Sequence, residues 1–208
     1  MLIALRHRNF RLLWIGLLVS FSGTFMQSAA VLWHVSVLVP ADQRAIALGL
    51  VGLVRIVPVI LFSLISGVAA DAFDRRKLML MTQAGMAMLA AVLALLTFRG
   101  LTVVWPIYLL TAVSAAAGAF DLPARQALTP NLVPLEHLPN AITLNSIMLQ
   151  TASVAGPAIG GLVLATLGVG WVYAINAVSF LFVIGALLAM DPPRSDETAP
   201  ADRSNFTV

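Results

Sequence analysis

The chain alternates between long apolar runs and short polar breaks. Because a helix needs about 20 apolar residues to cross the hydrocarbon core of a bilayer, each run is long enough to span a membrane. The runs cover residues 12–39, 45–70, 78–98, 101–120, 141–167 and 171–190. The pattern therefore predicts an all-α membrane protein in which residues 12–190 form a bundle of six transmembrane helices.

The breaks between the runs contain the residue types that end helices. They are rich in proline, glycine and charge, and they lie at 40–44, 71–77, 99–100, 121–140 and 168–170. The last stretch, residues 191–208, holds three prolines, four acidic residues and two arginines. Because it has almost no apolar side chains to bury, we expect it to be a flexible cytoplasmic tail or a linker between domains.

Composition excludes several classes of protein. Hydrophobic residues make up 60 % of the 208 residues and charged residues only 10 %, and the mean hydropathy is +0.96, which is far from the values of a soluble domain. The chain has no cysteine, so disulfide and thiol chemistry are excluded. It also lacks a nucleophile elbow, a histidine pair at metal-ligand spacing and a phosphate-binding loop. We therefore expect no enzyme activity and no cofactor, and an ion gradient rather than ATP as the energy source.

The basic residues indicate how the helices are oriented. Nine of the twelve fall on one side of the predicted spans: Arg6, Arg8, Arg11, Arg75, Arg76, Lys77, Arg125, Arg194 and Arg203. The positive-inside rule places this side, with residues 1–11 and both termini, in the cytoplasm. The same distribution accounts for the pI near 10.2 without a nucleic-acid partner. We expect a multi-pass protein of the bacterial inner (plasma) membrane whose surroundings are the lipid bilayer.

The break between the second and third spans carries a specific motif. Gly67 is followed four residues later by Asp71, and then by the basic pair Arg75 and Arg76. This spacing, between these two spans, resembles the loop motif of the major facilitator superfamily. Two positions depart from the family pattern, with Ala72 in place of a basic residue and Asp74 in place of a glycine.

The resemblance implies a latch on the cytoplasmic side. In it, Arg75 or Arg76 pairs with Asp121 at the end of the fourth span, while Asp71 meets a helix of a second six-helix half. Gly67 allows that helix to approach closely, because glycine has no side chain. In the alternative interpretation these charges only fix the topology of the chain.

The fifth span contains Gly156, Pro157, Gly160 and Gly161. An interior proline removes a backbone hydrogen bond and bends a helix, and the glycines favour close packing. The group resembles the core of the antiporter motif of facilitator exporters, although the longer form has a glycine where this chain has Ala152. The alternative is an ordinary kinked span with a small-residue packing face.

Further segments narrow the resemblance to the branch that holds enterobactin (siderophore) exporters and macrolide efflux proteins. They are residues 8–14, 73–76, 120–128, 132–134, 138–141 and 144–146. The resemblance covers residues 8 to about 190. It implies a secondary active transporter that exports a small organic molecule, such as a siderophore or a hydrophobic drug, by alternating access and proton antiport. The implied partners are the small-molecule substrate, protons and a second six-helix half.

The same resemblance implies that the six spans form a 3+3 inverted repeat and are the N-terminal half of a transporter. Residues 45–48 (Ala-Ile-Ala-Leu) and 141–144 (Ala-Ile-Thr-Leu) are similar and would occupy equivalent positions in such a repeat. The alternative is a half-length membrane protein that does not transport alone and acts as a partner-binding or dimerising subunit.

The polar residues inside the spans predict a substrate cavity. Arg55 lies near mid-membrane, where a lone base is costly unless it faces water or a partner. Gln27 and His34 share one face of the first span, and Thr24 lies beside it. We interpret this face as the lining of a cavity in which Arg55 contacts an anionic or carbonyl-rich substrate. Alternatively, Arg55 is a structural anchor, and His34 is a proton carrier or an interfacial residue.

Overall fold

The computed structural model describes residues 2–72 and 74–190, apart from the side chains at 64 and 68–72. Its long helices are α1 (Arg8–Leu38), α2 (Arg44–Ala72), α3 (Arg75–Phe98), α4 (Trp105–Leu128), α5 (Leu138–Thr166) and α6 (Val169–Ala189). All six are long and apolar enough to cross a membrane, so the predicted all-α, six-span architecture is confirmed. The predicted tail at 191–208 lies outside the described residues.

Short connections join these helices. The 3-10 turns η1 (Ile3–Arg6), η2 (Ala41–Gln43), η3 (Thr129–Leu132) and η4 (Leu135–His137) lie before α1, before α2 and between α4 and α5. The reversals from α3 to α4 and from α5 to α6 use glycine in the left-handed region, with φ of +80° at Gly100 and +91° at Gly168. Glycine adopts this backbone conformation without steric strain, which is why so few residues separate α3 from α4 and α5 from α6.

The fourth helix differs most from its predicted range of 101–120. It begins at Trp105 and continues to Leu128, through both Asp121 and Pro123. The predicted stop at Asp121 does not occur because side chains of α3 satisfy its carboxylate. Interior prolines are also tolerated in two other helices, at Pro58 of α2 and Pro157 of α5.

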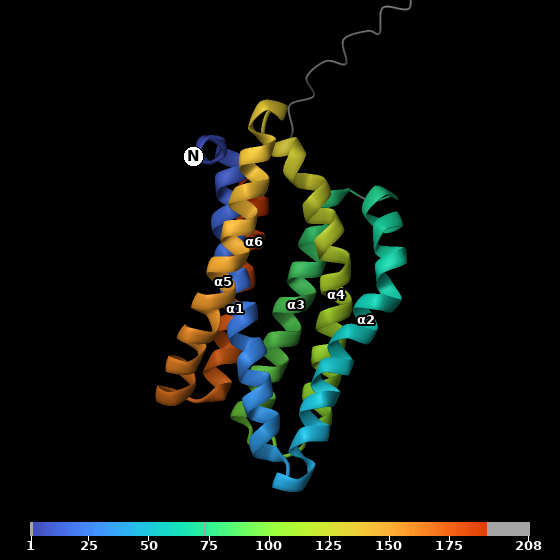
Figure 1. Ribbon diagram of the computed structural model, residues 1–208, viewed down its shortest axis with the longest axis vertical. Coiled ribbons are helices and arrows are strands. Elements are labelled where there is room, and N and C mark those ends of the chain that lie inside the picture. The colour runs from blue at the N-terminus through green and yellow to red at the C-terminus, as the bar shows by residue number, and fades with distance from the viewer. Residues whose placement is uncertain (1, 73, 191–208) are drawn as a thin grey trace, which may run out of the picture.

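The helices pack in a pattern that an inverted repeat requires (Figure 1). α1 packs on α5 and α6, α4 packs on α2 and α3, and α3 packs on α6. Exchanging α1–α3 with α4–α6 turns the α1–α5 contact into α4–α2 and the α1–α6 contact into α4–α3. The main contacts therefore map onto one another, as the predicted 3+3 arrangement demands, although within the described residues the smaller α1–α2 contact has no comparable α4–α5 counterpart.

The helix pairs α1–α5 and α4–α2 form two equivalent corners of the bundle, and one aromatic hydrogen bond joins the helices at each corner. Trp14 Nε1 of α1 donates to the carbonyl of Leu144 in α5, at 3.0 Å. Tyr108 Oη of α4 donates to the carbonyl of Ala47 in α2, also at 3.0 Å. The two acceptors lie in the segments 45–48 and 141–144, so the sequence similarity between these segments corresponds to an equivalent structural position.

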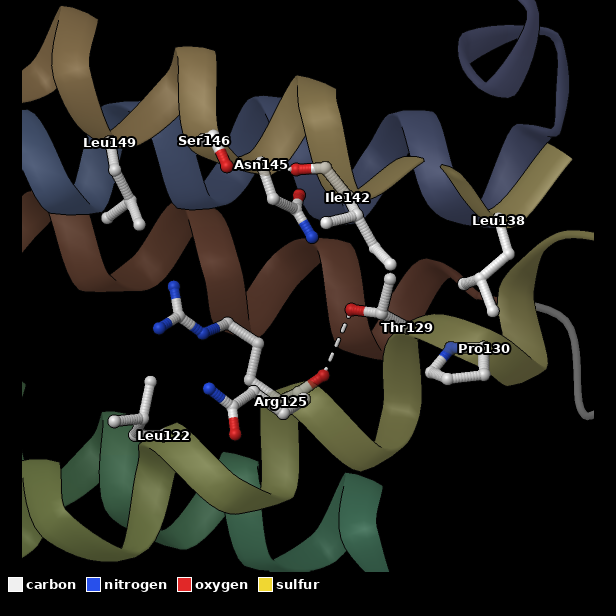
Figure 2. A pocket seen from close by; sticks show the side chains of 10 residues that line it. Leu122, Arg125, Thr129, Pro130, Leu138, Ile142, Asn145, Ser146 and Leu149 are labelled. Atoms are coloured by element: carbon white, nitrogen blue, oxygen red, sulfur yellow. Dashed lines mark hydrogen bonds between the residues drawn. The ribbon is translucent and has the colours of Figure 1, made fainter. Parts of the chain in front are cut away.

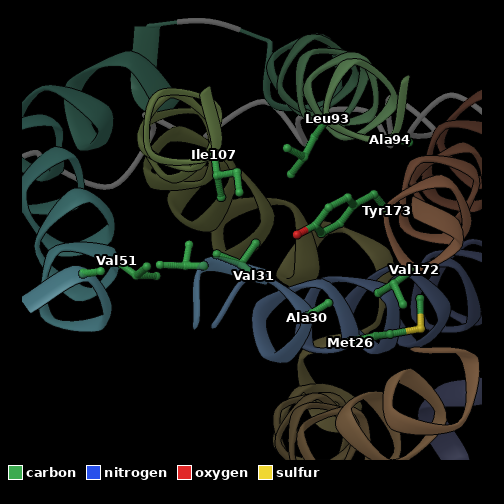
Figure 3. Packing of buried hydrophobic residues seen from close by; sticks show 11 residues of the cluster. Met26, Ala30, Val31, Val51, Leu93, Ala94, Ile107, Val172 and Tyr173 are labelled. Carbon is green, nitrogen blue, oxygen red and sulfur yellow. The ribbon is translucent and has the colours of Figure 1, made fainter. Parts of the chain in front are cut away.

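An apolar cluster joins the two repeats near the end of the bundle where α1 ends and α6 begins (Figure 3). Five helices contribute to it: its buried members are Met26, Ala30, Val31, Val35, Ala47, Val51, Leu93, Ala94, Ile107, Val172 and Tyr173. Tyr173 is fully buried there. A phenol in such a place needs a hydrogen-bond partner, which the site described below supplies.

Candidate functional site

A pocket of about 350 Å³ lies in the middle of the bundle. Residues of α1, α2, α3, α4 and α6 line it, and they come from the central parts of these helices. Its polar lining consists of Thr24, Gln27, Ser28, Arg55, Thr111, Ser114 and Asn176. At mid-membrane depth such a polar surface is costly unless it faces water or a ligand, so we refer to this space as the central pocket and treat it as the candidate binding site.

Amide and hydroxyl groups of the central pocket are only partly satisfied by the protein. Asn176 Nδ2 donates to Gln27 Oε1 at 2.8 Å, and Thr24 Oγ1 donates to the Ser20 carbonyl at 2.9 Å. The Thr111 hydroxyl is buried and has no hydrogen-bond partner within the part of the chain that the structure describes. An unpaired buried hydroxyl at a pocket wall is available to a water molecule or a bound ligand.

The structure brings three of the four predicted cavity residues together. Thr24, Gln27 and Arg55 line the central pocket, whereas His34 does not; the binding role of the first three stays a prediction. Sequence reasoning missed four polar residues that also line the pocket: Ser28, Thr111, Ser114 and Asn176. Polar residues three apart in the fourth span, and an asparagine inside the apolar run of the sixth, were the signals that could have found most of them.

His34 is buried outside the central pocket. Its Nδ1 lies 3.1 Å from the Tyr173 hydroxyl, and only 4 % of the residue is exposed. The side chain thus turns into the bundle and packs beside α6, and its role as a proton carrier or an interfacial residue stays a prediction.

Asp121 forms a buried polar group with two residues of α3. One of its carboxylate oxygens accepts hydrogen bonds from Thr82 Oγ1 at 2.9 Å and from Gln83 Nε2 at 3.0 Å. Arg125 follows one turn later on α4 and interacts electrostatically with the carboxylate. The guanidinium of Arg125 also lies 4.4 Å from the centre of the Phe21 ring of α1, a cation–π distance. This group ties α1, α3 and α4 together.

The predicted pairing of Arg75 or Arg76 with Asp121 is not formed. Arg75 Nη1 donates to the Ala127 carbonyl at 3.0 Å, and Arg76 Nη2 donates to the Leu188 carbonyl at 3.4 Å. Both acceptors lie in the last turns of their helices, where carbonyls lack intrahelical partners and attract cations. Asp121 lies about two turns further inside α4, where α3 supplies its donors, so the arginines reach the helix ends instead.

Asp74, which stands where the family loop motif has a glycine, has a structural role. Its Oδ1 accepts hydrogen bonds from the backbone N–H groups of Arg76 at 2.9 Å and Lys77 at 3.1 Å. Asp74 is thus the N-cap of α3, and it starts the third span immediately before its basic residues. No heavy atom of the described residues lies near the missing Cβ of Gly67. The Asp71 side chain lies outside the described residues, so the latch role of both residues stays a prediction.

A second pocket, of about 330 Å³, lies between the end of α4 and the beginning of α5 (Figure 2). Figure 2 shows the Arg125 side chain extending into the space between these helices, with Asn145 facing it from α5. The pocket begins near the Asp121 group, because both Leu122 and Arg125 line it. Leu122 also lines the central pocket, so a single turn of α4 separates the two spaces.

The four residues of the predicted antiporter motif divide into two sets. A Cβ at Gly156 would lie 2.5 Å from the Ser22 carbonyl oxygen of α1, and one at Gly160 would lie 2.6 Å from Met26 Cγ. Gly161 faces open space, and Pro157 lies within the helix between the two packing glycines. The motif therefore fixes a close contact between α5 and α1, and its part in antiport stays a prediction.

Comparison with known proteins identifies the family. The major facilitator family described as transmembrane secretion effector matches residues 1–207. Among curated relatives, the staphyloferrin A transporter of Staphylococcus aureus is 26 % identical over 89 % of this chain and 46 % of its own length. Macrolide efflux protein A of Streptococcus pyogenes is 26 % identical over 87 % of this chain and 42 % of its own. The enterobactin exporter of Shigella boydii is 34 % identical over 66 % of this chain and 34 % of its own.

These relatives are longer than the present chain, which spans less than half of the length of each. No solved structure matches the chain significantly. The match to the family nevertheless extends over nearly all of its residues, and the fold supplies the six apolar helices and the inverted repeat. The chain is a multi-pass membrane protein and belongs to the transmembrane secretion effector family of the major facilitator superfamily of transporters.

Proposed function

We propose that this chain is the N-terminal six-helix half of an exporter that moves small organic molecules out of a bacterial cell in exchange for protons. The relatives named for a siderophore and for macrolide efflux support export of such cargo. Transporters of this superfamily are built from two six-helix halves that rock about a central site, each half containing a 3+3 inverted repeat. The contact pattern of the present helices is the one expected of such a half.

The central pocket is the observation that carries the proposal. Arg55 reaches it from α2, and among the described residues no hydrogen bond satisfies the guanidinium and no acid lines the pocket with it. Its planar fork of donors suits carboxylate or carbonyl oxygens. We therefore assign the cargo to small molecules that present such oxygens, with Thr111, Gln27 and Asn176 as further hydrogen-bonding groups.

The second half would close the site from the side of α2. This helix contacts mainly α4, and it presents many exposed apolar residues, among them Ile56, Ile60 and Leu61. Gly67, near the end of α2, leaves room for a close helix, as the family latch requires. In this arrangement Asp71 and the Arg75 loop lie on the cytoplasmic side of the inner membrane and hold the two halves together there.

Efflux from bacteria that lack their own siderophore and macrolide exporters tests the proposal. The gene is expressed in full, and the cellular content of a macrolide and the release of a catecholate or carboxylate siderophore are measured. We expect export of at least one cargo class, and a loss of about tenfold or more on Arg55→Ala, the effect of removing a charged hydrogen-bond donor.

Arg55→Lys separates recognition from charge, because lysine keeps the charge but loses the planar fork. A changed preference between the cargo classes supports direct contact with Arg55. Export with unaltered preference would count against recognition by Arg55, and absence of export of either class from a correctly inserted protein would refute the function.

A further inference from the structure

His34 and Tyr173 form a buried hydrogen-bonded pair that the proposed binding site does not use. The two side chains come from α1 and α6, the distance between Nδ1 and Oη is 3.1 Å, and the ring centres are 5.8 Å apart. Exposed fractions are 4 % for His34 and 0 % for Tyr173. When a histidine buried this far from water gains a proton, the local electrostatic potential changes strongly, because the surroundings screen the new charge poorly.

The surroundings of the pair are apolar on every packed helix except at one point. α1 itself presents Val31 and Val35, and α3 presents Leu93 and Ala94. On α4, the Tyr108 hydroxyl is occupied by the Ala47 carbonyl. The exception is Arg55 of α2, which interacts electrostatically with Tyr173.

The pair is close to the central pocket through both of its neighbouring helices. Val51 packs in the same cluster as Tyr173, and Arg55 lies one turn further along α2 on the same face. Asn176, one turn beyond Tyr173 on α6, lines the central pocket together with Arg55. Figure 3 shows Tyr173 extending from α6 into the interior of the bundle, with Val31 and Val51 on the side to which its hydroxyl points.

We propose that His34 is the proton-binding residue of the transport cycle and that Tyr173 transmits its protonation to Arg55 in the central pocket. The inference rests on the proposed function, since it assigns the site at which the exchanged proton is held. It uses the orientation proposed above, in which the His34 end of α1 lies on the outer side of the membrane, where protons enter.

The Tyr173 hydroxyl has one proton, so it can donate only one hydrogen bond at a time. When His34 is neutral at Nδ1, the Tyr173 O–H donates to that nitrogen, and the oxygen lone pairs are free to face the Arg55 guanidinium. When Nδ1 binds a proton, its N–H donates to the tyrosine oxygen, and the phenolic proton must turn away from His34. One oxygen lone pair is then occupied by His34, so the attraction that the oxygen exerts on the Arg55 guanidinium weakens.

This reversal makes proton binding and cargo binding compete. A carbonyl-rich cargo depends on the orientation of the guanidinium fork more than on net charge. The neutral pair holds Arg55 in the binding orientation, and protonation from the outer side releases it and with it the cargo. A proton from the outer side binds as cargo leaves, and it must be released to the cytoplasm before the next cargo molecule binds, as proton antiport requires.

The absence of cysteine allows a direct measurement in membranes. A single cysteine is introduced at Ser114, which lines the central pocket. Its rates of reaction with anionic sulfonatoethyl and cationic trimethylammonium-ethyl methanethiosulfonate are compared between pH 8 and pH 5.5. The ratio of the two rates reports the electrostatic potential of the pocket and cancels the ionisation of the thiol itself. Val113→Cys, its exposed neighbour at the same depth, is the control for access through lipid.

We expect the anionic-to-cationic rate ratio at Ser114→Cys to rise about fourfold or more on acidification, because a new positive charge inside the bundle attracts the anionic reagent and repels the cationic one. His34→Gln should abolish the rise. Tyr173→Phe, which keeps the ring and its packing, should at least halve it, while His7→Gln and His137→Gln should leave it unchanged.

The outcomes separate the two proposals. A reactive Ser114→Cys whose rate ratio responds to pH equally with and without His34 overturns the proton site but leaves the binding pocket intact. If Tyr173→Phe has no effect on the response, transmission through Tyr173 is overturned and the proton site at His34 stands alone. A cysteine at 114 that reacts no faster than one at 113 shows that the pocket is closed to water, and it overturns both the pocket and the inference.

Discussion

The two diagonal corners of the bundle, α1–α5 and α2–α4, are equivalent in the inverted repeat but are packed differently. Each is joined at one end by an aromatic donor and a backbone carbonyl, Trp14 to Leu144 in one and Tyr108 to Ala47 in the other. Apart from this common type of hydrogen bond, the α1–α5 corner is held by close packing at two glycines, which we call the glycine lock. At Gly156 and Gly160 the missing side chains leave α5 in direct contact with α1.

The α2–α4 corner has no such lock among its described residues. Cβ atoms at Gly52 of α2 and Gly118 of α4 would meet nothing within 4 Å. The contact is made by side chains, such as the Phe62 and Phe120 rings, whose centres are 5.7 Å apart. The difference indicates that backbone contact holds α5 against α1, whereas side chains alone hold α2, which carries Arg55, against α4.

The largest expected effect comes from filling the glycine lock. Gly156→Val places a Cβ 2.5 Å from a backbone oxygen of α1, and neither backbone can move aside cheaply. Overpacking of this kind costs about 1–3 kcal/mol or more. We expect a clear fall in the thermal unfolding midpoint in detergent, followed by tryptophan fluorescence.

Gly161→Val is the matched control, because it lies on the same helix and faces open space. Its unfolding midpoint should stay close to that of the wild type, as should that of Gly118→Val on the other corner. Equal losses for Gly156→Val and Gly161→Val would show that close packing against α1 does not explain the motif, since helix propensity alone favours valine over glycine at both positions.

A smaller effect is expected from the next pair of equivalent contacts, α4–α3 and α1–α6. The first is held by Thr82 and Gln83 on the carboxylate of Asp121, and the second by the neutral bond between Gln27 and Asn176. Thr82→Val removes a hydrogen bond to a charged group, worth about 1.5–3 kcal/mol, whereas Gln27→Met removes a neutral one, worth about 1 kcal/mol.

The ratio of these losses is the informative quantity. Asn176 lines the central pocket, so water can replace the lost amide and keep the cost of Gln27→Met low, whereas Asp121 is 6 % exposed and has no such replacement. Chemical denaturation of the two variants measures both. A greater loss for Gln27→Met would mean that the central pocket is dry.

The sequence predicts the frame of this protein better than its polar contacts. The six apolar runs give the helices because span length depends only on the run itself, and the loop motif identifies the family. The partners of Arg75, Arg76 and Asp121 are not predictable in this way. Which group an arginine reaches depends on where two distant helices end, and here those ends are Ala127 and Leu188.

The residues of the central pocket were only partly predictable from the sequence. Arg55, Gln27 and Thr24 are recognisable as polar residues at one depth, and the structure places them together. Thr111 and Asn176 belong to the same pocket, but a polar residue in an apolar span carries no sign of the direction in which it points. His34 is the opposite case, because it was predicted to line the cavity and does not. It lies on the same face of its helix as Gln27, but its side chain contacts Tyr173 instead of the pocket.

The smallest expected effect comes from the shared hydrogen bonds of the two corners. Tyr108→Phe and Trp14→Phe each remove one side-chain donor, and the backbone acceptors keep their helical hydrogen bonds, so each should cost about 0.5–1.5 kcal/mol. Because the bonds lie at opposite ends of the bundle, the losses should add within about 0.5 kcal/mol in the double variant. Denaturation of the three variants in one detergent measures the sum. A double variant that loses much less than this sum would mean that the first substitution already weakens the other corner. The α1–α5 and α2–α4 contacts would then not be independent of each other.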